Sequence, residues 1–369
     1  MARAKLFSVF IMLIMVAGLI GPVGLVSGQA FVKAHPLLTQ LAAEQPDQLV
    51  AVIVQKLARD THLEALVARL GGVVTRDLHI INAFAAEMEA QDALALARDQ
   101  GVRWVSLDAP VERSGKQAPA PASGSNPTNT YLDTLGVRSV WNMGLQGQGI
   151  TIAVIDSGVS VDSDFSVSGS RNKSRLLKQI VFCTNSTSSN DVYGHGTHVA
   201  GIIAGNGSDS GGLYTGVAPQ ANLISLKIAD GTGMAYESDV VKALQWVYDN
   251  SASYNIRVVN LSLNSTVQMT YHLSPLNAAA EILWFNGIVV VASSGNEDGA
   301  AVNTTNAAPA NDPFIITVGA SDEQGTSSSS DDTFAPFSAF GTTPDGFLKP
   351  DVVAPGKDII SILSKNSWW

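Results

Sequence analysis

An aspartate and a histidine, each in a distinctive context, are the residues of this chain best suited to chemistry. Asp156 ends the apolar run 152–155, and His195 lies between two glycines at the start of a small-residue helix pattern. Taken alone, either residue could be purely structural: the aspartate could cap a helix or form a turn, and the histidine could be an ordinary residue with its hydrogen bonds satisfied. Together, a carboxylate can fix the tautomer of an imidazole, which then takes a proton from a nucleophilic hydroxyl. The pair predicts hydrolysis, with Asp156 orienting His195 as the general base.

An amide follows a later apolar run and could serve the same reaction. The apolar run covers residues 289–293, and Gly295 and Asn296 follow shortly after it. A side-chain amide directed at a developing oxyanion contributes about 3–4 kcal/mol to transition-state stability. A lone Gly-Asn pair is typical of a turn, but its place after Asp156 and His195 favours the oxyanion role for Asn296.

Three other features suggest chemistry that we do not expect. His198 lies three residues after His195, yet Gly and Thr separate them, whereas zinc peptidases use His-Glu-x-x-His, so His198 is expected to be structural. The only cysteine, Cys183, cannot form an intramolecular disulfide and lacks a nucleophile motif, so we expect a packed thiol. The glycines within 144–149 precede a strand instead of following one, which excludes a dinucleotide site.

Composition indicates a folded acidic protein. Of 369 residues, 46% are hydrophobic and 15% charged, which favours a large core and more than one domain. The net charge of −10 argues against nucleic acid or an anionic membrane surface as a partner.

The first thirty residues have the pattern of a secretory signal. Arg3 and Lys5 precede the uncharged run Leu6–Ile20, and small residues follow at 26–30. An uncleaved anchor helix is the alternative, but the Gly-Pro pair at 21–22 interrupts the apolar stretch. We therefore expect residues 1–30 to be a cleaved signal, and the protein to be secreted without a membrane anchor.

A small α+β unit is predicted next, over about 47–110 within a segment 31–113. Its pattern of strand 49–54, helix 62–70, strands 73–79 and 83–88, helix 90–100 and strand 102–107 is typical of a ferredoxin-like fold. Residues 114–129 are rich in Pro, Ser, Gly and Asn and predict an exposed linker.

The remaining segment, 130–369, alternates strands and helices. Continuous β-branched runs predict parallel strands at 150–155, 223–228, 258–263, 288–292 and 315–318, and helices are expected at 195–204, 238–248 and 276–285. This is the pattern of an α/β, doubly wound, mostly parallel sheet. Sites in such sheets form at the carboxyl ends of the strands, where Asp156 and Asn296 fall.

Six motifs now show a resemblance. From about Val137 onward the chain resembles the catalytic domain of subtilisin-like serine proteases (subtilases), and residues 47–110 resemble their inhibitor-type propeptide in pattern and position. The matching motifs are Val-Ile-Asp-Ser-Gly-Val (154–159), Gly-His-Gly-Thr-His-Val-Ala-Gly (194–201), Gly-Val-Ala-Pro (216–219), Val-Asn-Leu-Ser-Leu (259–263), Ala-Ser-Ser-Gly-Asn (292–296) and Lys-Pro-Asp-Val-Val-Ala-Pro-Gly (349–356).

The resemblance implies a serine endopeptidase with polypeptide substrates, made as a monomeric zymogen that its own propeptide inhibits. Asp156 and His195 take triad roles and Asn296 the oxyanion role, with no required cofactor. Calcium is plausible at 206–209, where a plain loop is the alternative, and no metal residues are assigned. Two segments would flank a bound peptide as strands and read mainly its main chain: Gly231, Thr232 and Gly233 (within 231–235), and Ser262, Leu263 and Asn264. The family usually has glycine where Asn264 stands, so a side chain there is expected to narrow the primary pocket.

The family's order continues to a serine in a Gly-Thr-Ser-Met-Ala-like context, which does not occur here before Trp369. We expect Asp358–Leu363 to supply the preceding strand and the chain to be a fragment, inactive as 369 residues. Ser361, Ser364 and Ser367 are not nominated, because no small-residue helix follows them. Two alternatives stay open: a non-catalytic subtilase-like protein that binds peptides or acts as a scaffold, and an inhibitor unit fused to an inactive domain.

Overall fold

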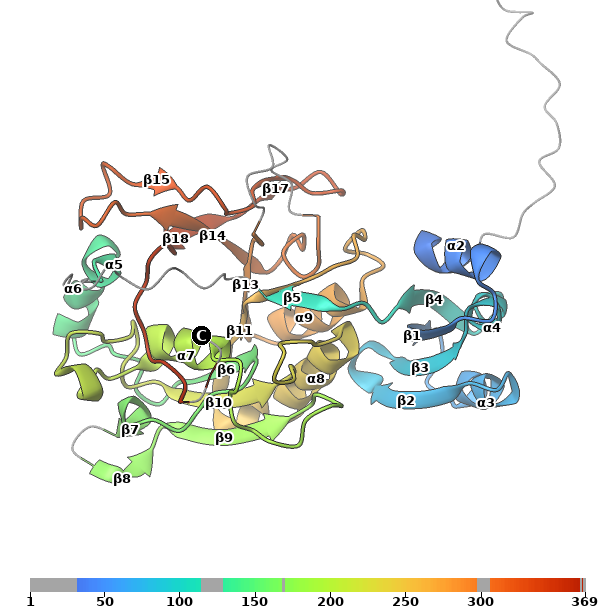
Figure 1. Cartoon of the computed structure of the whole chain (residues 1–369), viewed down its shortest axis with the longest axis horizontal. Helices are drawn as coiled ribbons and strands as arrows, with labels where there is room; N and C mark the ends of the chain where they lie inside the picture. Colours follow the sequence, from blue (N-terminus) through green and yellow to red (C-terminus); the bar gives the residue numbers. More distant parts are fainter. Residues whose placement is uncertain (1–31, 114–128, 168–169, 297–305, 366, 368–369) are drawn as a thin grey trace, which may run out of the picture.

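The computed structural model describes residues 32–113, 129–167, 170–296, 306–365 and 367. The predicted signal segment and nearly all of the predicted linker lie outside these residues. The described chain forms a small N-terminal unit and a larger unit beside it (Figure 1).

The N-terminal unit has the predicted βαββαβ order. Its sheet has the strand order β2-β3-β1-β4, and every pairing is antiparallel, as in a ferredoxin-like fold. In chain order its elements are β1 (Leu49–Lys56), α3 (His62–Arg69), β2 (Val73–Leu78), the 3₁₀ turn η1 (His79–Ile81), β3 (Ala83–Glu89), α4 (Ala90–Leu96) and β4 (Val102–Leu107).

Two boundaries of this unit differ from the prediction. A helix missed by the periodicity, α2 (Pro36–Glu44), precedes residue 47; it begins with proline, and the imidazole of His35 accepts a hydrogen bond from the amide of Leu37. Helix α4 ends at Leu96, short of residue 100, because the chain turns there and Asp99 accepts a hydrogen bond from the amide of Gly101 at 2.7 Å. The compact unit therefore begins earlier, and its second helix is shorter.

The larger unit is built on one mostly parallel sheet. Its strand order is β15-β14-β13-β11-β6-β10-β9, with β18 also paired to β14; only β14 and β15 run antiparallel. The strands are β6 (Thr151–Asp156), β9 (Leu176–Val181), β10 (Asn222–Lys227), β11 (Ile256–Leu261), β13 (Val289–Ser293), β14 (Ile316–Asp322), β15 (Thr333–Phe334) and β18 (Val352–Pro355).

Helices cover both faces of this sheet, which confirms the doubly wound prediction. Ile152 and Val154 of β6 pack with α7 (His195–Ala204), whereas Ala153 and Ile155 pack with α8 (Glu237–Tyr254). Since successive side chains of a strand point to opposite faces, α7 and α8 lie on opposite sides. Helix α9 (Pro275–Phe285) lies beside α8, and the N-terminal unit packs on both through β2 and η1 (Figure 1).

Two predicted strands of this unit are wrong: one is interrupted, and the other is absent. The run 258–263 is broken at Ser262 into β11 and a short strand, β12 (Leu263–Ser265), which leaves the main sheet. Residues Asp358–Leu363 form no strand. The Ile360 amide donates a hydrogen bond to the side chain of Asn129, and the Ser361 hydroxyl donates one to the carbonyl of His198 in α7.

Helix α8 is longer than predicted. It runs to Tyr254, six residues beyond the predicted end at 248, and Asn255 in the left-handed region terminates it.

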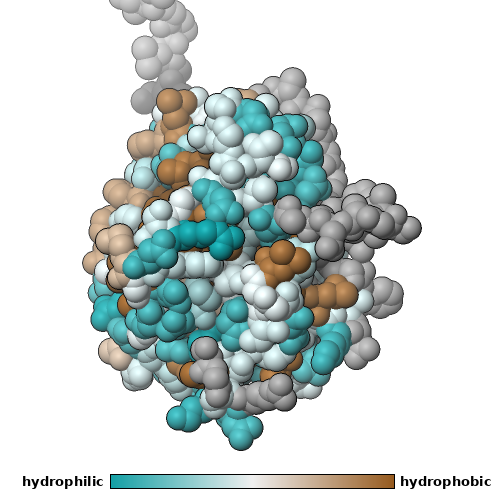
Figure 2. All heavy atoms as spheres, turned by 90° about the vertical axis from the view of Figure 1, so that its left-hand side faces the viewer, coloured by the Kyte–Doolittle hydropathy of each residue, from teal (hydrophilic) through white to brown (hydrophobic). Residues whose placement is uncertain are grey.

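Short elements complete the larger unit. They are β5 (Val111–Arg113), α5 (Tyr131–Thr134), α6 (Val137–Asn142), η2 (Ser163–Phe165), β7 (Ser166–Val167), β8 (Ser170–Ser174), η3 (Ser208–Ser210), β16 (Gly341–Thr342) and β17 (Leu348–Lys349). On the face toward the viewer in Figure 2, apolar side chains form separate small groups among polar ones. Within the described residues, no helix combines the length and apolarity needed to cross a bilayer.

Candidate active site

The carboxylate of Asp156 lies at the carboxyl end of a fully buried strand. All six residues of β6 are buried, and β10 and β11 flank the strand in parallel register. The Asp156 side chain is 1% exposed and accepts a hydrogen bond from the amide of Ser157 at 2.7 Å. A strand held on both sides gives this carboxylate a fixed position.

His195 is the first residue of α7, and its ring faces Asp156. Its Nδ1 atom lies 2.7 Å from Oδ1 and 2.9 Å from Oδ2 of Asp156, and both residues are buried. Because an ionised carboxylate only accepts hydrogen bonds, Nδ1 carries the proton, and Nε2 is left as the acceptor atom. The structure therefore joins the two predicted residues in an orientation that suits general-base chemistry.

Glycine beside His195 permits this contact. A Cβ atom on Gly196 would lie 2.1 Å from the carbonyl oxygen of Gly158 and 3.1 Å from the Cβ of Asp156. Gly194, with φ of +103°, caps the helix in a backbone region that side chains disfavour. The Gly-His-Gly sequence thus lets α7 begin directly against the end of β6.

Asn296 also lies at the carboxyl end of the parallel strands. It follows β13, which pairs with β11, the neighbour of β6, so Asn296 and Asp156 end strands two positions apart. At about 4.8 Å between strands this separation is about 10 Å across the sheet. Asn296 is exposed and pairs through its backbone with Ser338. Its position is compatible with the predicted oxyanion role.

The two segments predicted to flank a peptide enclose a strand of the chain itself. Strand β5 pairs antiparallel with β12, placing Arg113 opposite Leu263 and Glu112 opposite Asn264. On its other side the amide of Val111 donates to the carbonyl of Ala235 at 3.0 Å. The side chain of Val111 is buried, so β5 fills the space between the two segments, which we call the groove.

The predicted groove residues contribute differently. Leu263 is buried beneath β5, and Asn264 directs its amide nitrogen to within 3.4 Å of the carbonyl and hydroxyl oxygens of Ser293. Gly231, Thr232 and Gly233 form a turn that Asp230 closes through hydrogen bonds from the Thr232 amide and hydroxyl. In the described chain the pairing with β5 falls at Ala235 and Tyr236, just after this turn.

Carboxylates from both units meet beside this groove. Asp108 accepts hydrogen bonds from the amide and hydroxyl of Ser238 in the first turn of α8, at 2.9 and 2.6 Å. Burial raises the pKa of Glu237 to about 8 and that of Asp239 to about 7, with Asp108 adding to both. Burial also raises the pKa of Asp108 itself. The first turn of α8 is thus a buried acidic contact between the units.

His198 and Cys183 occupy structural surroundings. The Nε2 atom of His198 donates to the carbonyl oxygen of Ile359 at 3.2 Å, and burial lowers the pKa of its imidazole. The thiol of Cys183 is free and buried, and burial raises its pKa. Both side chains thus have the surroundings of structural residues, as the sequence predicted.

Four buried polar residues near Asp156 and His195 escaped the sequence analysis. Two of them lie inside the motifs around Asp156 and His195 and two belong to no motif, and in neither case does the residue type alone indicate the contacts that the fold gives it. They are Ser157, Asp191, Thr197 and Lys227.

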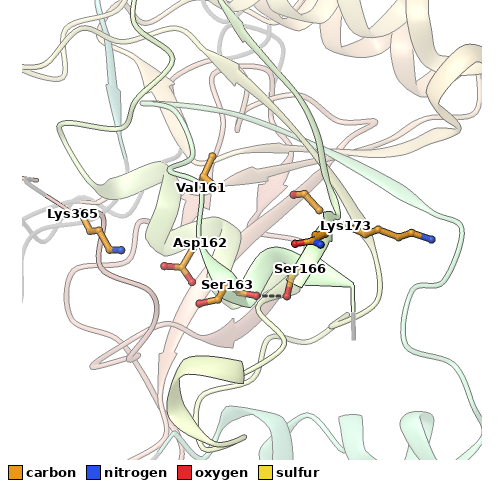
Figure 3. A pocket seen from close by; sticks show the side chains of 8 residues that line it. Val161, Asp162, Ser163, Ser166, Lys173 and Lys365 are labelled. Carbon is orange, nitrogen blue, oxygen red and sulfur yellow. Dashed lines mark hydrogen bonds between the residues drawn. The ribbon is translucent and has the colours of Figure 1, made fainter. Parts of the chain in front are cut away.

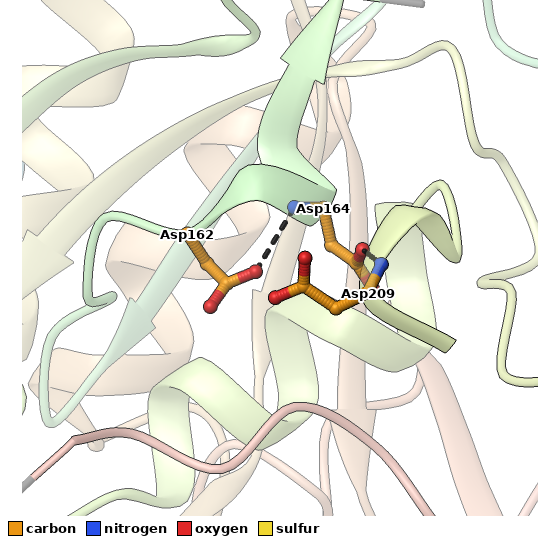
Figure 4. Close-up of side chains that lie close together, drawn as sticks. All are labelled: Asp162, Asp164 and Asp209. Atoms are coloured by element: carbon orange, nitrogen blue, oxygen red, sulfur yellow. Dashed lines mark hydrogen bonds between the residues drawn. The ribbon is translucent and has the colours of Figure 1, made fainter. Parts of the chain in front are cut away.

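An acidic trio is the one group of possible metal ligands found among the described residues. Asp162, Asp164 and Asp209 place ligand atoms within 4.8 Å of one another (Figure 4), and Asp209 belongs to the predicted stretch 206–209. Oxygen donors of this kind suit calcium. Each carboxylate also accepts a hydrogen bond, from the Asp164 amide, the Asp209 amide and the Ser163 hydroxyl respectively. Each carboxylate thus has a protein donor, and we assign no metal to the trio.

A pocket of about 260 Å³ lies next to the trio. Its lining includes Asp162, Ser163, Lys173 and Lys365 (Figure 3). Neither Asp156 nor His195 lines it, so this pocket is separate from the candidate active site.

Comparison with known proteins agrees with this geometry. Residues 147–368 match the subtilase family (Peptidase_S8). Over 229 residues the chain is 36% identical to serine protease AprX of Bacillus subtilis, covering 61% of this chain and 50% of that protein. It is 30% identical over 305 residues to subtilisin NAT of Bacillus subtilis subsp. natto, covering 82% and 69%. It is 33% identical over 245 residues to a thermophilic serine proteinase of Bacillus sp. (strain AK1), covering 66% and 51%. The chain thus spans about half the length of two of these relatives.

Proposed function

The chain belongs to the subtilase family, and from this we propose that the protein is a serine endopeptidase using an Asp-His-Ser triad. The observation that carries the proposal is the contact of 2.7 Å between Asp156 Oδ1 and His195 Nδ1. Asp156 holds the imidazole in one tautomer and stabilises the imidazolium that forms, and His195 takes the hydroxyl proton through Nε2. The amide of Asn296 stabilises the oxyanion.

The nucleophile of this mechanism is a serine that we propose to lie after residue 369 in the complete protein. Support comes from the order of the six motifs, which leads toward such a serine, and from the relatives, which contain sequence that this chain does not cover. Polypeptides are the proposed substrates, bound as a strand between β12 and Ala235 in the manner of β5. Main-chain pairing of this kind favours broad specificity.

We further propose that the N-terminal unit is an inhibitory propeptide of a secreted zymogen. Strand β5, which follows the N-terminal unit in the chain, fills the groove that a substrate would need, and the N-terminal unit packs on α8 and α9. The match to subtilisin NAT covers more of the chain than residues 114–369 can supply, so it extends into the N-terminal unit. The predicted signal, residues 1–30, would direct the protein out of the cell and be removed in the process.

The test uses the full-length protein and a fluorogenic peptide mixture. Wild type should hydrolyse the peptides and react with a serine-directed fluorophosphonate, whereas Asp156→Asn should lower kcat by about 10⁴-fold through the wrong tautomer. Asp133→Asn, an exposed carboxylate on α5, serves as the control. A well-folded wild type that binds peptides without cleaving them would instead support the non-catalytic alternative.

The zymogen proposal has its own measurement. N-terminal sequencing of the protein from the culture medium should give a start near residue 30 for the precursor and one after residue 113 for the active form. Activity that does not rise when the N-terminal unit is removed would contradict an inhibitory role.

A further inference from the structure

A second buried carboxylate contacts both segments that carry Asp156 and His195. The side chain of Asp191 is 1% exposed, and each of its oxygens accepts two hydrogen bonds. Oδ1 accepts from the Ser157 hydroxyl and the Gly194 amide, both at 2.8 Å. Oδ2 accepts from the amide and hydroxyl of Thr197, at 2.8 and 2.7 Å. Asp191 therefore ties the residue after Asp156 to the residues on either side of His195.

The hydroxyl of Ser157 completes this link. It donates to Asp191 and accepts a hydrogen bond from the amide of Gly196 at 2.9 Å. The end of β6 and the first turn of α7 are thus joined by a hydroxyl and a carboxylate, both buried. Because α7 carries His195, these bonds fix the distance across which the imidazole meets Asp156.

A buried cation also joins these two segments. Lys227 ends β10 opposite Asp156, and its side chain is 1% exposed. Its Nζ atom donates to the carbonyl of Ser157 at 2.8 Å and to the carbonyl of Asn190 at 2.7 Å. These residues follow Asp156 and precede Asp191, so one ammonium joins the backbone segments that carry the two carboxylates. Burying two carboxylates without such a partner would be strongly unfavourable.

We propose that Asp191 is a positioning residue for the reaction: together with Ser157, Thr197 and Lys227 (the Asp191 cluster) it sets the placement of His195 relative to Asp156. The catalytic part of this inference rests on the proposed function. The geometric part does not, because the contact between the two side chains exists without a substrate.

A purely structural role makes a different prediction. Asp191 also caps the first turn of α7 through Thr197, and loss of a cap lowers stability. If capping were its whole role, variants that stay folded would keep the native orientation of His195 and a normal kcat. A positioning role instead predicts a lower kcat with a nearly unchanged KM, because a misplaced base weakens only the transition state.

The experiment compares full-length wild type with Asp191→Asn, Ser157→Ala and Asp312→Asn. The asparagine keeps the volume of Asp191 but accepts through one oxygen only, so two of the four bonds are lost. Ser157→Ala removes the bridging hydroxyl alone. Asp312 is the matched control. It is fully buried and accepts hydrogen bonds from the amides of Phe314 and Ile315 near the amino end of β14, whereas Asp156 and His195 lie at the carboxyl ends of the parallel strands.

Two readouts are taken on folded protein, as judged by circular dichroism. The first is the low-field proton resonance of His195 Nδ1–H, assigned by its loss in His195→Ala. The second is kcat and KM on a peptide substrate. Asp191→Asn should shift or abolish the resonance and lower kcat by about 10–100-fold with KM within threefold. Ser157→Ala should lower kcat about 3–10-fold, and Asp312→Asn should leave the resonance and kcat as in wild type.

The inference is overturned if Asp191→Asn and Ser157→Ala fold and keep the wild-type resonance and a kcat within twofold. If Asp191→Asn does not fold, Ser157→Ala decides by the same criteria. If the wild type cleaves no peptide, the proposed function fails, and the resonance alone decides whether the Asp191 cluster positions His195.

Discussion

Arg76 of the N-terminal unit forms an ion pair with Asp239 in the first turn of α8, where the Asp239 side chain is 3% exposed. The same guanidinium donates to the carbonyl of Phe182 at 2.7 Å and to the hydroxyl of Thr184 at 2.8 Å. One side chain of the small unit thus satisfies three acceptors of the large one. The packing of the two units therefore depends on a charge whose removal leaves Asp239 buried and unpaired.

At pH 9, where the carboxylate of Asp239 is ionised, replacing Arg76 by methionine should destabilise the protein by about 3–5 kcal/mol, the usual cost of breaking a buried ion pair from one side. Urea unfolding followed by tryptophan fluorescence would measure it. Lys242→Met is the control, because Lys242 pairs with an Asp77 carboxylate that is 64% exposed, and such a pair contributes less than about 1 kcal/mol. Equal losses in the two variants would contradict the importance of burial.

Docking of the two units should weaken as pH rises. Burial raises the pKa of Glu237 to about 8 in the docked state, from an ordinary value of 4.5 that the carboxyl would approach once hydrated. A raised pKa means that the stabilisation is complete below about 4.5 and is lost progressively up to about 8. Over this window the titration of one such group lowers the equilibrium constant for docking by up to about tenfold per pH unit.

The variant Glu237→Gln tests this dependence, because its amide is neutral at every pH. Its urea midpoint should match that of wild type at pH 4 and exceed it at pH 9. Glu112→Gln, on the exposed side of β5, should follow the wild-type curve throughout. Parallel curves for Glu237→Gln and wild type would show that Glu237 does not govern the pH dependence.

Truncation of Val111 should loosen the strand that fills the groove. Its side chain is 4% exposed and packs in the same core as Ala235 and Leu263, so Val111→Ala should cost about 2 kcal/mol. Hydrogen exchange of the β5 amides reports the effect directly. Glu112→Ala removes an exposed side chain and should leave exchange within about 0.5 kcal/mol of wild type. Identical exchange rates for both variants would mean that Val111 does not anchor β5.

A methyl group at Gly196 should separate His195 from Asp156. The added Cβ would meet the backbone carbonyl of Gly158 at 2.1 Å, and backbone cannot rotate away. Gly196→Ala should therefore lower stability by at least about 3 kcal/mol and remove the low-field histidine resonance. Gly325→Ala meets nothing within 4 Å and strains only a left-handed backbone, at about 1 kcal/mol. A Gly196 variant with the stability of the Gly325 variant would contradict this account.

Local sequence was enough to predict the elements that carry Asp156 and His195. The run before Asp156 is apolar on both faces of its strand, and small residues mark the start of α7, so neither needed tertiary information. By contrast, β9 (Leu176–Val181) contains exposed Lys178 and lies at an edge of the sheet, where the pattern of a buried strand is absent. Edge strands of this kind give a weak apolar signal.

The features missed at the site depend on contacts between distant segments. Nothing in Val111, Glu112 and Arg113 predicts that they pair with residues about 150 positions later, because strand register is set by the partner. Asp191 and Lys227 have no periodicity or motif, and their roles appear only when β6, β10 and α7 meet. Sequence alone could place the two central side chains but not the polar groups that hold them.

In the proposed zymogen β5 is joined covalently to the groove that it fills, so an added peptide competes with a ligand present at an effective concentration in the millimolar range. Cutting the connection would leave every atomic contact of that strand in place and still change the competition, since the freed segment would then count only at its bulk concentration. A single cut would therefore favour release on dilution, without any change of shape in the larger unit.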